Sequence, residues 1–313
     1  MRQTLMLLLV LLSLVLPSSG VDLSVPVWTD SEKAAAEVEG FPLVGEYLSR
    51  SGPSALQVTL LKDGDFLVAI YRGGLPGNGW DGSRIESRKL NSEALKAILE
   101  GYTKTDRESP TLEMPAPDEA ILVFPDDFTN VENGLLHAGG RSIREVGSFH
   151  LHIEFMLPFK PGRDPSSQDR GNSGIYIFNN YEVQVIDSFG LDLEEENNAI
   201  GIESESNRWC GALYKTKAPD VNMALSPLRW QTYDIDFEAP QFDGDRKTRN
   251  ARITVEHNGV RVHDGVELKD GTGLGATREQ CAEGRIYFQD HGNPVVFRNV
   301  WATALESSAA SNP

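Results

Sequence analysis

The chain of 313 residues carries 46 acidic and 29 basic residues, a formal net charge of −17 at pH 7. A surface this acidic repels nucleic-acid phosphates and anionic lipids, so neither is expected as a partner and a neutral ligand fits better. The length and the otherwise ordinary composition fit a globular protein of about two domains.

Residues 1–20 have the pattern of a secretory signal peptide. Arg2 supplies the positive start, Leu5–Leu16 is almost entirely apolar, and small residues permit cleavage after Gly20. The apolar run is too short to cross a bilayer, which takes roughly 20 residues. We therefore expect an exported protein, periplasmic or extracellular, with no membrane insertion after cleavage and a polar leader over residues 21–37.

Residues 38–105 predict a small β-rich domain. The runs FPLVGEYL, ALQVTLL and DFLVAIYR are typical of strands, and Gly, Ser and Asp turns separate them. The segment SEALKAILEGY has the apolar stripe of a short helix, which Asn91 or Ser92 would cap. Residues 106–120 are rich in proline and lack periodicity, which predicts a linker.

Residues 121–305 consist of short β runs separated by turns, and residues 306–313 form a tail. With no long helical period between the runs, this pattern favours an antiparallel β-sandwich over alternating β and α units. An exported chain permits a disulfide between Cys210 and Cys281, which we favour slightly over two unpaired thiols. Two cysteines this far apart do not suggest a zinc site.

The segment RGNSGIYIFNNYEVQVIDSFG (170–190) carries the clearest candidate chemistry. Its alternating Ile and Val residues predict a β-hairpin, and Asn179-Asn180 tolerates the positive φ of a tight turn. Glu182 and Gln184 then share one strand face, because side chains repeat every two residues. Asp187 falls out of phase unless a bulge re-aims it towards them.

A second polar group lies in the segment GRIYFQDHGNPVVFRNVW (284–301), which predicts two strands around a turn. Gln289, Asp290 and His291 precede the turn, and a histidine of near-neutral pKa suits acid–base work. Asp290 would orient His291 only if the turn brings them together. Arg298 lies two residues from apolar neighbours on either side, which predicts that it projects into a concave face; a salt bridge is the alternative.

The pattern FHLHIEFM places His150, His152 and Glu154 on one strand face. A His-x-His pair is able to hold a metal ion, but the sequence brings in no further ligands. Cross-strand polar packing is the favoured interpretation, and no metal site is predicted.

Taken in order with CGALY (210–214), NMALSPLRWQTYDIDF (222–237) and ARITVEHNGVRVHDG (251–265), these two polar segments closely resemble the 3-keto-disaccharide hydrolase domain family. The resemblance covers about residues 121–304. It implies a concanavalin A-like jelly roll of two curved antiparallel sheets with a concave carbohydrate-binding face. A small β module with a similar GGLPGxGWDG loop often precedes this domain in exported proteins.

The resemblance implies cleavage of a glycoside that carries a ketone at carbon 3, made by a separate sugar oxidoreductase. Glu182 and His291 would form the base and acid pair, in either order, with Gln184 and Arg298 on the ketone side. Asp187 or Asp290 would orient His291 or contact hydroxyls. No cofactor is assigned, although a divalent cation such as calcium is the alternative to Arg298 as polariser. The residues expected to line the sugar groove are Arg170, Asn172, Tyr214, Gln289 and Arg298.

Two other functions remain open. A non-catalytic jelly roll would use the same face to bind carbohydrate. An ordinary glycosidase would act on unoxidised sugars, but it requires two well-placed carboxylates. Here the pattern Glu-x-Gln-x-x-Asp has an amide where similar jelly-roll glucanases have a carboxylate, which makes the ordinary glycosidase less favoured.

Overall fold

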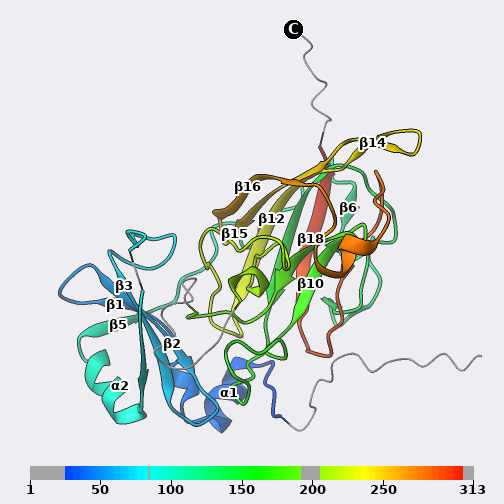
Figure 1. Cartoon of the computed structure of the whole chain (residues 1–313). Helices are drawn as coiled ribbons and strands as arrows, with labels where there is room; N and C mark the ends of the chain where they lie inside the picture. The colour runs from blue at the N-terminus through cyan, green and yellow to red at the C-terminus, as the bar shows by residue number, and fades with distance from the viewer. Residues whose placement is uncertain (1–24, 84, 192–204, 306–313) are drawn as a thin grey trace, which may run out of the picture.

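A computed structural model describes residues 25–83, 85–191 and 205–305. The signal peptide and the tail predicted at the two ends lie outside the described residues. Within the described ranges, no helix is long and apolar enough to cross a membrane. Figure 1 shows a smaller N-terminal part, coloured blue to cyan, beside a larger β-sandwich coloured green to red.

The N-terminal part is one antiparallel five-stranded sheet with the order β4-β3-β2-β1-β5. The three predicted strands and the helix are present, and Asn91 caps the helix by accepting a hydrogen bond from the backbone N–H of Ala94. The sequence did not predict β4 and β5, because these edge strands are short, polar and largely exposed and so lack an apolar alternation. The elements are β1 (Gly45–Ser49), β2 (Ser54–Leu60), β3 (Phe66–Arg72), β4 (Glu86–Leu90), α2 (Ser92–Leu99) and β5 (Tyr102–Thr105).

The predicted polar leader is structured from residue 25 and docks on the sandwich. Trp28 exchanges two backbone hydrogen bonds with Phe159, at 3.0 and 2.8 Å. Helix α1 (Ser31–Glu37) follows, capped by the Asp30 side chain, and leads into the 3₁₀ helix η1 (Phe41–Leu43). Phe159 itself is buried in the core of the N-terminal sheet. The sequence did not predict the helix in this leader, because the helix is short and mostly polar and has one buried residue.

The sandwich packs an eight-stranded antiparallel sheet against a three-stranded one, which confirms the predicted jelly-roll class. The large sheet has the order β16-β15-β12-β9-β18-β8-β7 with β6 paired to β18, and the small sheet has the order β11-β10-β17. The large sheet comprises β6 (Leu122–Val123), β7 (Val131–Glu132), β8 (Leu135–His137), β9 (Phe149–Met156), β12 (Trp230–Glu238), β15 (Ala251–His257), β16 (Val260–Leu268) and β18 (Val296–Ala304). The small sheet comprises β10 (Ser173–Ile177), β11 (Tyr181–Val185) and β17 (Ile286–Phe288), and the remaining elements are β13 (Gln241–Asp243), β14 (Arg246–Arg249), η3 (Ser206–Arg208) and η4 (Gly273–Thr277).

The hydrophobic core lies between the two sheets. Strand β9 contributes its alternate apolar residues, and the small sheet contributes Ile175, Ile177, Val183 and Val185. Because strand side chains alternate, the residues between these apolar positions point away from the core. The outer face of the small sheet therefore presents Glu182 and Gln184 together, as the sequence predicts.

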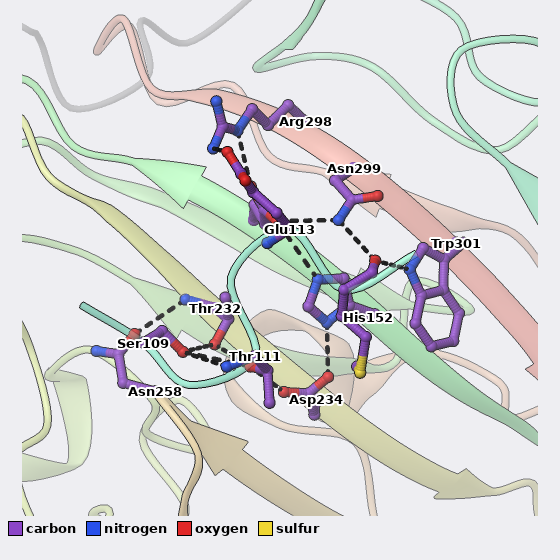
Figure 2. Close-up of polar contacts among 12 residues, drawn as sticks. Ser109, Thr111, Glu113, His152, Thr232, Asp234, Asn258, Arg298, Asn299 and Trp301 are labelled. Carbon is purple, nitrogen blue, oxygen red and sulfur yellow. Dashed lines mark hydrogen bonds and ion pairs between the residues drawn. The ribbon is translucent and has the colours of Figure 1, made fainter. Parts of the chain in front are cut away.

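The predicted linker packs on part of the outer face of the large sheet, over β9, β12 and β18 (Figure 2). The Thr111 hydroxyl donates to Asp234 Oδ2 at 2.8 Å, and the backbone N–H of Glu113 donates to Glu154. His152 Nδ1 lies 2.6 Å from Asp234 Oδ1 beneath this segment. These contacts agree with cross-strand polar packing of the strand face that includes His152 and Glu154. The linker is therefore docked along the sheet, and we call residues 106–120 the connector from here on.

The two cysteines are free, which corrects the favoured disulfide. Cys210 is buried in the sandwich core, where its Sγ lies 3.0 Å from the Tyr233 hydroxyl. Cys281 is exposed on the surface. One thiol faces the core and the other faces solvent, so the fold keeps them apart.

Candidate active site

The hairpin of β10 and β11 sets the geometry of the candidate site. Its register pairs Tyr176 with Glu182 and Gly174 with Gln184, as the sequence alternation requires. The positive φ values of the turn fall on Phe178 and Asn179, one position earlier than the predicted Asn179-Asn180. Phe178 adopts this conformation while its ring packs into the core, 5.3 Å from the ring of Phe237.

Glu182 is almost fully buried, with 2% of its surface exposed. Its Oε2 has no hydrogen-bond partner among the described residues. Burial raises the pKa of Glu182 to about 7, although the Tyr176 hydroxyl and the charge of Lys215 oppose the shift. A carboxyl group of this pKa is able to take up and release a proton near neutral pH.

A pocket of about 270 Å³ opens above Glu182 on the outer face of the small sheet. It unites six of the ten predicted site residues, drawn from both polar segments of the sequence. The residues lining it are Asn172, Tyr176, Glu182, Gln184, Tyr214, Lys215, Gly273, Leu274, Gln289 and His291.

Three buried polar atoms on the pocket lining have no hydrogen-bond partner in the part of the chain that the structure describes: Glu182 Oε2, Asn172 Oδ1 and Gln289 Oε1. A buried oxygen without a hydrogen bond is costly, so such atoms mark where a ligand or water completes the structure. All three are acceptors as placed. A ligand with several hydroxyl groups would satisfy them, because each hydroxyl donates one hydrogen bond.

Gln168 is a residue of this site that the sequence reasoning missed. Its Oε1 accepts long hydrogen bonds from Gln184 Nε2 at 3.4 Å and from the Tyr214 hydroxyl at 3.5 Å. Its backbone carbonyl accepts one from Asn172 Nδ2 at 2.7 Å. Gln168 thus contacts three pocket residues from an irregular loop, where no periodicity could have indicated it.

Arg170 and Asp187 are not on the pocket lining, which corrects their predicted placement. They form a buried ion pair with each other, with Arg170 Nε 2.7 Å from Asp187 Oδ2 and both side chains 1% exposed. The backbone N–H of Asp187 also donates to the Arg170 carbonyl at 3.0 Å. No bulge interrupts the register of β10 and β11, so Asp187 is not re-aimed towards Glu182. The pair braces the open end of the hairpin.

Asp290 is exposed, and its side chain stabilises the turn that follows it. Its Oδ1 accepts a hydrogen bond from the backbone N–H of Gly292 at 2.8 Å. His291, the next residue, lines the pocket and is half-buried. The turn therefore places His291 on the lining of the pocket that also contains Glu182, and leaves Asp290 outside it.

Arg298 lies on the outer face of the large sheet, on the opposite side of the core from Glu182. Its Nε donates to Glu154 Oε2 at 2.7 Å, and its guanidinium lies 4.2 Å from the Trp230 ring centre. The predicted placement is wrong because the register of β18 shifts between Arg298 and Trp301, where Asn299 has a φ of +43°. This irregularity breaks the simple alternation on which the prediction relied, and the salt bridge named as the alternative is present.

No group of three or more His, Cys, Asp or Glu side chains in the described ranges is arranged to hold a metal ion. Glu182 and His291 both line the pocket. Lys215, rather than Arg298, is the cationic side chain that this lining includes.

Gly174 provides a test of how closely the sheet positions Glu182. A Cβ atom at Gly174 would lie 2.5 Å from Glu182 Oε1, so Gly174→Ala is expected to displace the carboxylate. We expect turnover to fall by up to about 10²-fold, because even a small misplacement of a reacting group lowers the rate by that much. Steady-state kinetics together with thermal unfolding would check this. Unchanged turnover in a folded variant would show that the position of Glu182 is not critical.

The model of the 3-keto-alpha-glucoside-1,2-lyase-like domain family matches residues 96–303. A crystal structure of a candidate glycosyl hydrolase from Parabacteroides distasonis is similar, with 26% identity and a TM-score of 0.51 over 61% of this chain and 86% of that chain. Two further candidate glycosyl hydrolases from that organism give 18% and 19% identity, with TM-scores of 0.37 and 0.38. They cover 54% and 57% of this chain, and 76% and 94% of theirs. A comparison with curated proteins gives no significant match.

Proposed function

The chain belongs to the 3-keto-alpha-glucoside-1,2-lyase-like domain family, and we propose that it cleaves glycosides whose sugar carries a ketone at carbon 3. Family membership and the similarity to a candidate glycosyl hydrolase support a glycosidase-like function. The observation that carries the proposal is that Oε2 of buried Glu182 has no partner among the described residues, in a pocket whose lining includes two further acceptors of the same kind. A reactive carboxylate surrounded by hydroxyl-binding groups suits an acid–base reaction on a sugar.

The reaction begins with removal of a proton from C2, which the neighbouring ketone acidifies. The electron pair left on C2 forms the C1–C2 double bond while the C1–O bond breaks, and the departing oxygen takes a proton from an acid. Water then adds across the double bond, with hydrogen on C2 and hydroxyl on C1. The products are a free 3-keto sugar and the alcohol that formed the glycoside.

Glu182 is the proposed base for C2. It is the more deeply buried of the two titratable candidates, and its pKa of about 7 places it near the optimum for general base catalysis. His291 lines the same pocket and is half-buried, so it is placed to donate the proton to the departing oxygen. The order of these two roles is the part of the mechanism that variant kinetics must decide.

The ketone oxygen requires a hydrogen-bond donor or a positive charge as negative charge develops on it. Arg298 is not proposed for this role, because it lies on the outer face of the large sheet, away from the pocket. Lys215 and the Tyr214 hydroxyl are the proposed replacements, because both lie on the pocket lining. A divalent cation is the alternative polariser, and sensitivity to a chelator tests it.

The proposed substrate must come from an oxidation of a sugar hydroxyl at carbon 3, which is the work of a separate oxidoreductase. The acidic chain suits a neutral sugar substrate. We propose that this reaction takes place outside the cytoplasm, because residues 1–20 have the pattern of a secretory signal peptide.

The proposal is tested by incubating purified residues 21–313 with 3-keto-trehalose, 3-keto-lactose and their unoxidised parents, with and without chelator. Release of monosaccharide from only the keto sugars is the expected result. Release from the unoxidised parents would indicate an ordinary glycosidase. Binding without release from any sugar would indicate a carbohydrate-binding module.

A pH profile follows from the pKa of Glu182. As the base, Glu182 must be ionised, so kcat/KM is expected to rise with pH and level off above about 7. The effect on stability has the opposite sign: in the folded state the pKa of Glu182 lies above its ordinary value of 4.5, so the folded state holds the proton more tightly. The contribution of Glu182 to the unfolding free energy is therefore full below about pH 4.5 and is lost as pH rises towards 7.

Kinetics and chemical denaturation of the wild type and Glu182→Gln, from below pH 4.5 to above pH 7, would measure how kcat/KM and the unfolding free energy change with pH. A kcat/KM that stays flat across the range would contradict the assigned base.

A further inference from the structure

A second pocket, of about 400 Å³, is lined in part by strand β17 and by the turn between β10 and β11. Its lining includes Arg141, Arg285, Tyr287, Glu283 and the exposed Cys281. The two arginines and Glu283 are solvent-exposed, so the pocket is polar and carries charges of both signs. Such a lining offers hydrogen-bond donors and acceptors without a strong preference for a charged ligand.

Both pockets lie on the outer face of the small sheet. Strand β17 directs Ile286 and Phe288 into the core, so Tyr287 between them points outward, as Tyr176 does on β10. Cross-strand pairing forms a continuous row: Glu182 opposes Tyr176, Tyr176 opposes Tyr287, and an isolated bridge places Arg141 opposite Tyr287. The Tyr176 and Tyr287 ring centres are 6.3 Å apart. The row leads from the candidate base into the second pocket.

One segment of chain borders both pockets. Gly273 and Leu274, at the start of η4, line the first, and Cys281 lines the second. The segment is held close to the hairpin: a Cβ atom at Gly275 would lie 2.0 Å from the Asn180 carbonyl oxygen, and Arg278 Nη1 donates to the Asn179 carbonyl at 2.9 Å. The two pockets are therefore fixed relative to each other.

We propose that the second pocket is the binding subsite for the leaving group, the sugar or other hydroxylated alcohol attached through the C1 oxygen. The first pocket, at about 270 Å³, is smaller than the roughly 300–1,000 Å³ typical of sites for larger ligands, so it suits one sugar ring. The ring of Tyr287 offers an apolar face for the second sugar. Arg141 and Arg285 donate hydrogen bonds to its hydroxyls, and Glu283 accepts them. This subsite rests on the proposed function, because only a cleaved glycoside has a leaving group.

Replacing Tyr287 tests the assignment by substrate size. Tyr287→Ala is expected to raise KM for 3-keto-lactose by about tenfold, which corresponds to about 1.4 kcal/mol and lies within the range of an aromatic contact. KM for methyl 3-keto-glucoside, whose leaving group is methanol, is expected to stay unchanged. Tyr287→Phe keeps the ring and should restore the wild-type values. Equal changes for both substrates, or no change for either, would overturn the subsite.

Cys281 supplies a second measurement that does not depend on turnover. The chain has two cysteines, and Cys210 is buried, so a thiol reagent at alkaline pH should label Cys281, and Cys281→Ser should abolish the labelling. In the Glu182→Gln variant, lactose or 3-keto-lactose is expected to slow the labelling, whereas glucose and 3-keto-glucose are not.

These two measurements separate the subsite from the reaction. Labelling that proceeds at the same rate at saturating disaccharide overturns the subsite, whether or not the wild type turns over keto sugars. Protection by disaccharide in a protein that cleaves no keto sugar would instead keep the subsite as a glycan-binding surface and overturn the proposed reaction.

Discussion

Replacing Glu182 by glutamine is expected to reduce turnover of 3-keto disaccharides by about 10²–10⁴ while the fold stays intact. The amide has nearly the same shape as the carboxyl group but cannot accept the C2 proton. Because burial raises the pKa of Glu182 to about 7, the wild type bears the cost of a buried charge at alkaline pH, and the variant does not. Its melting temperature above neutral pH is therefore expected to equal or exceed that of the wild type.

Steady-state kinetics and thermal unfolding check this prediction, with Glu119→Gln as the matched control at an exposed position of the connector. The control is expected to keep wild-type turnover. Near wild-type turnover in Glu182→Gln would remove Glu182 from the mechanism and leave His291 as the base.

Replacing Asp187 by alanine is expected to lower the unfolding free energy by about 3–5 kcal/mol, because the buried guanidinium of Arg170 loses its carboxylate partner and keeps, among the described residues, only hydrogen bonds to backbone carbonyls. Both side chains are 1% exposed at an Nε–Oδ2 distance of 2.7 Å, so solvent cannot replace the lost carboxylate. Replacing both residues by apolar ones, as in Arg170→Met with Asp187→Leu, should recover much of the loss. Chemical denaturation measures the unfolding free energy of each variant.

The matched control is Asp243→Ala, which removes one partner of an exposed pair with Arg246, where the two side chains are 78% and 77% exposed. Its effect is expected to stay within about 1 kcal/mol. A stable Asp187→Ala protein that has lost turnover would place Asp187 in the chemistry after all. A destabilised protein whose folded fraction keeps turnover would establish the bracing role.

Local alternation was enough to predict the central part of the site. Glu182 and Gln184 lie where a strand of period two puts them, since both flank Val183, which faces the core. The position of His291 in the same pocket depends on β17 pairing with β10 across more than a hundred residues. Only the resemblance to a known family connected those two segments in the sequence.

The incorrect predictions of site residues have equally specific causes. Arg298 was misplaced because an irregularity at Asn299 shifts the register, and such irregularities leave little trace in a sequence. The family resemblance assigned Arg170 to the groove and Asp187 to His291 or the sugar hydroxyls, and nothing in the sequence indicated that these two side chains pair with each other. Gln168 was missed because its role comes from a loop, where the chain follows no period.

The connector determines where a stable fragment of this protein can begin. A sandwich is bounded by two outer faces, and here the connector packs on part of one of them while the candidate pocket opens on the other. A fragment starting at residue 121, the boundary suggested by composition, would lack Thr111 and Glu113 and so uncover His152, Asp234 and Glu154. It would also lack Trp28, whose backbone forms two hydrogen bonds with the backbone of Phe159. Expression of the sandwich by itself should therefore retain the segments upstream of residue 121, although they lie outside the pocket.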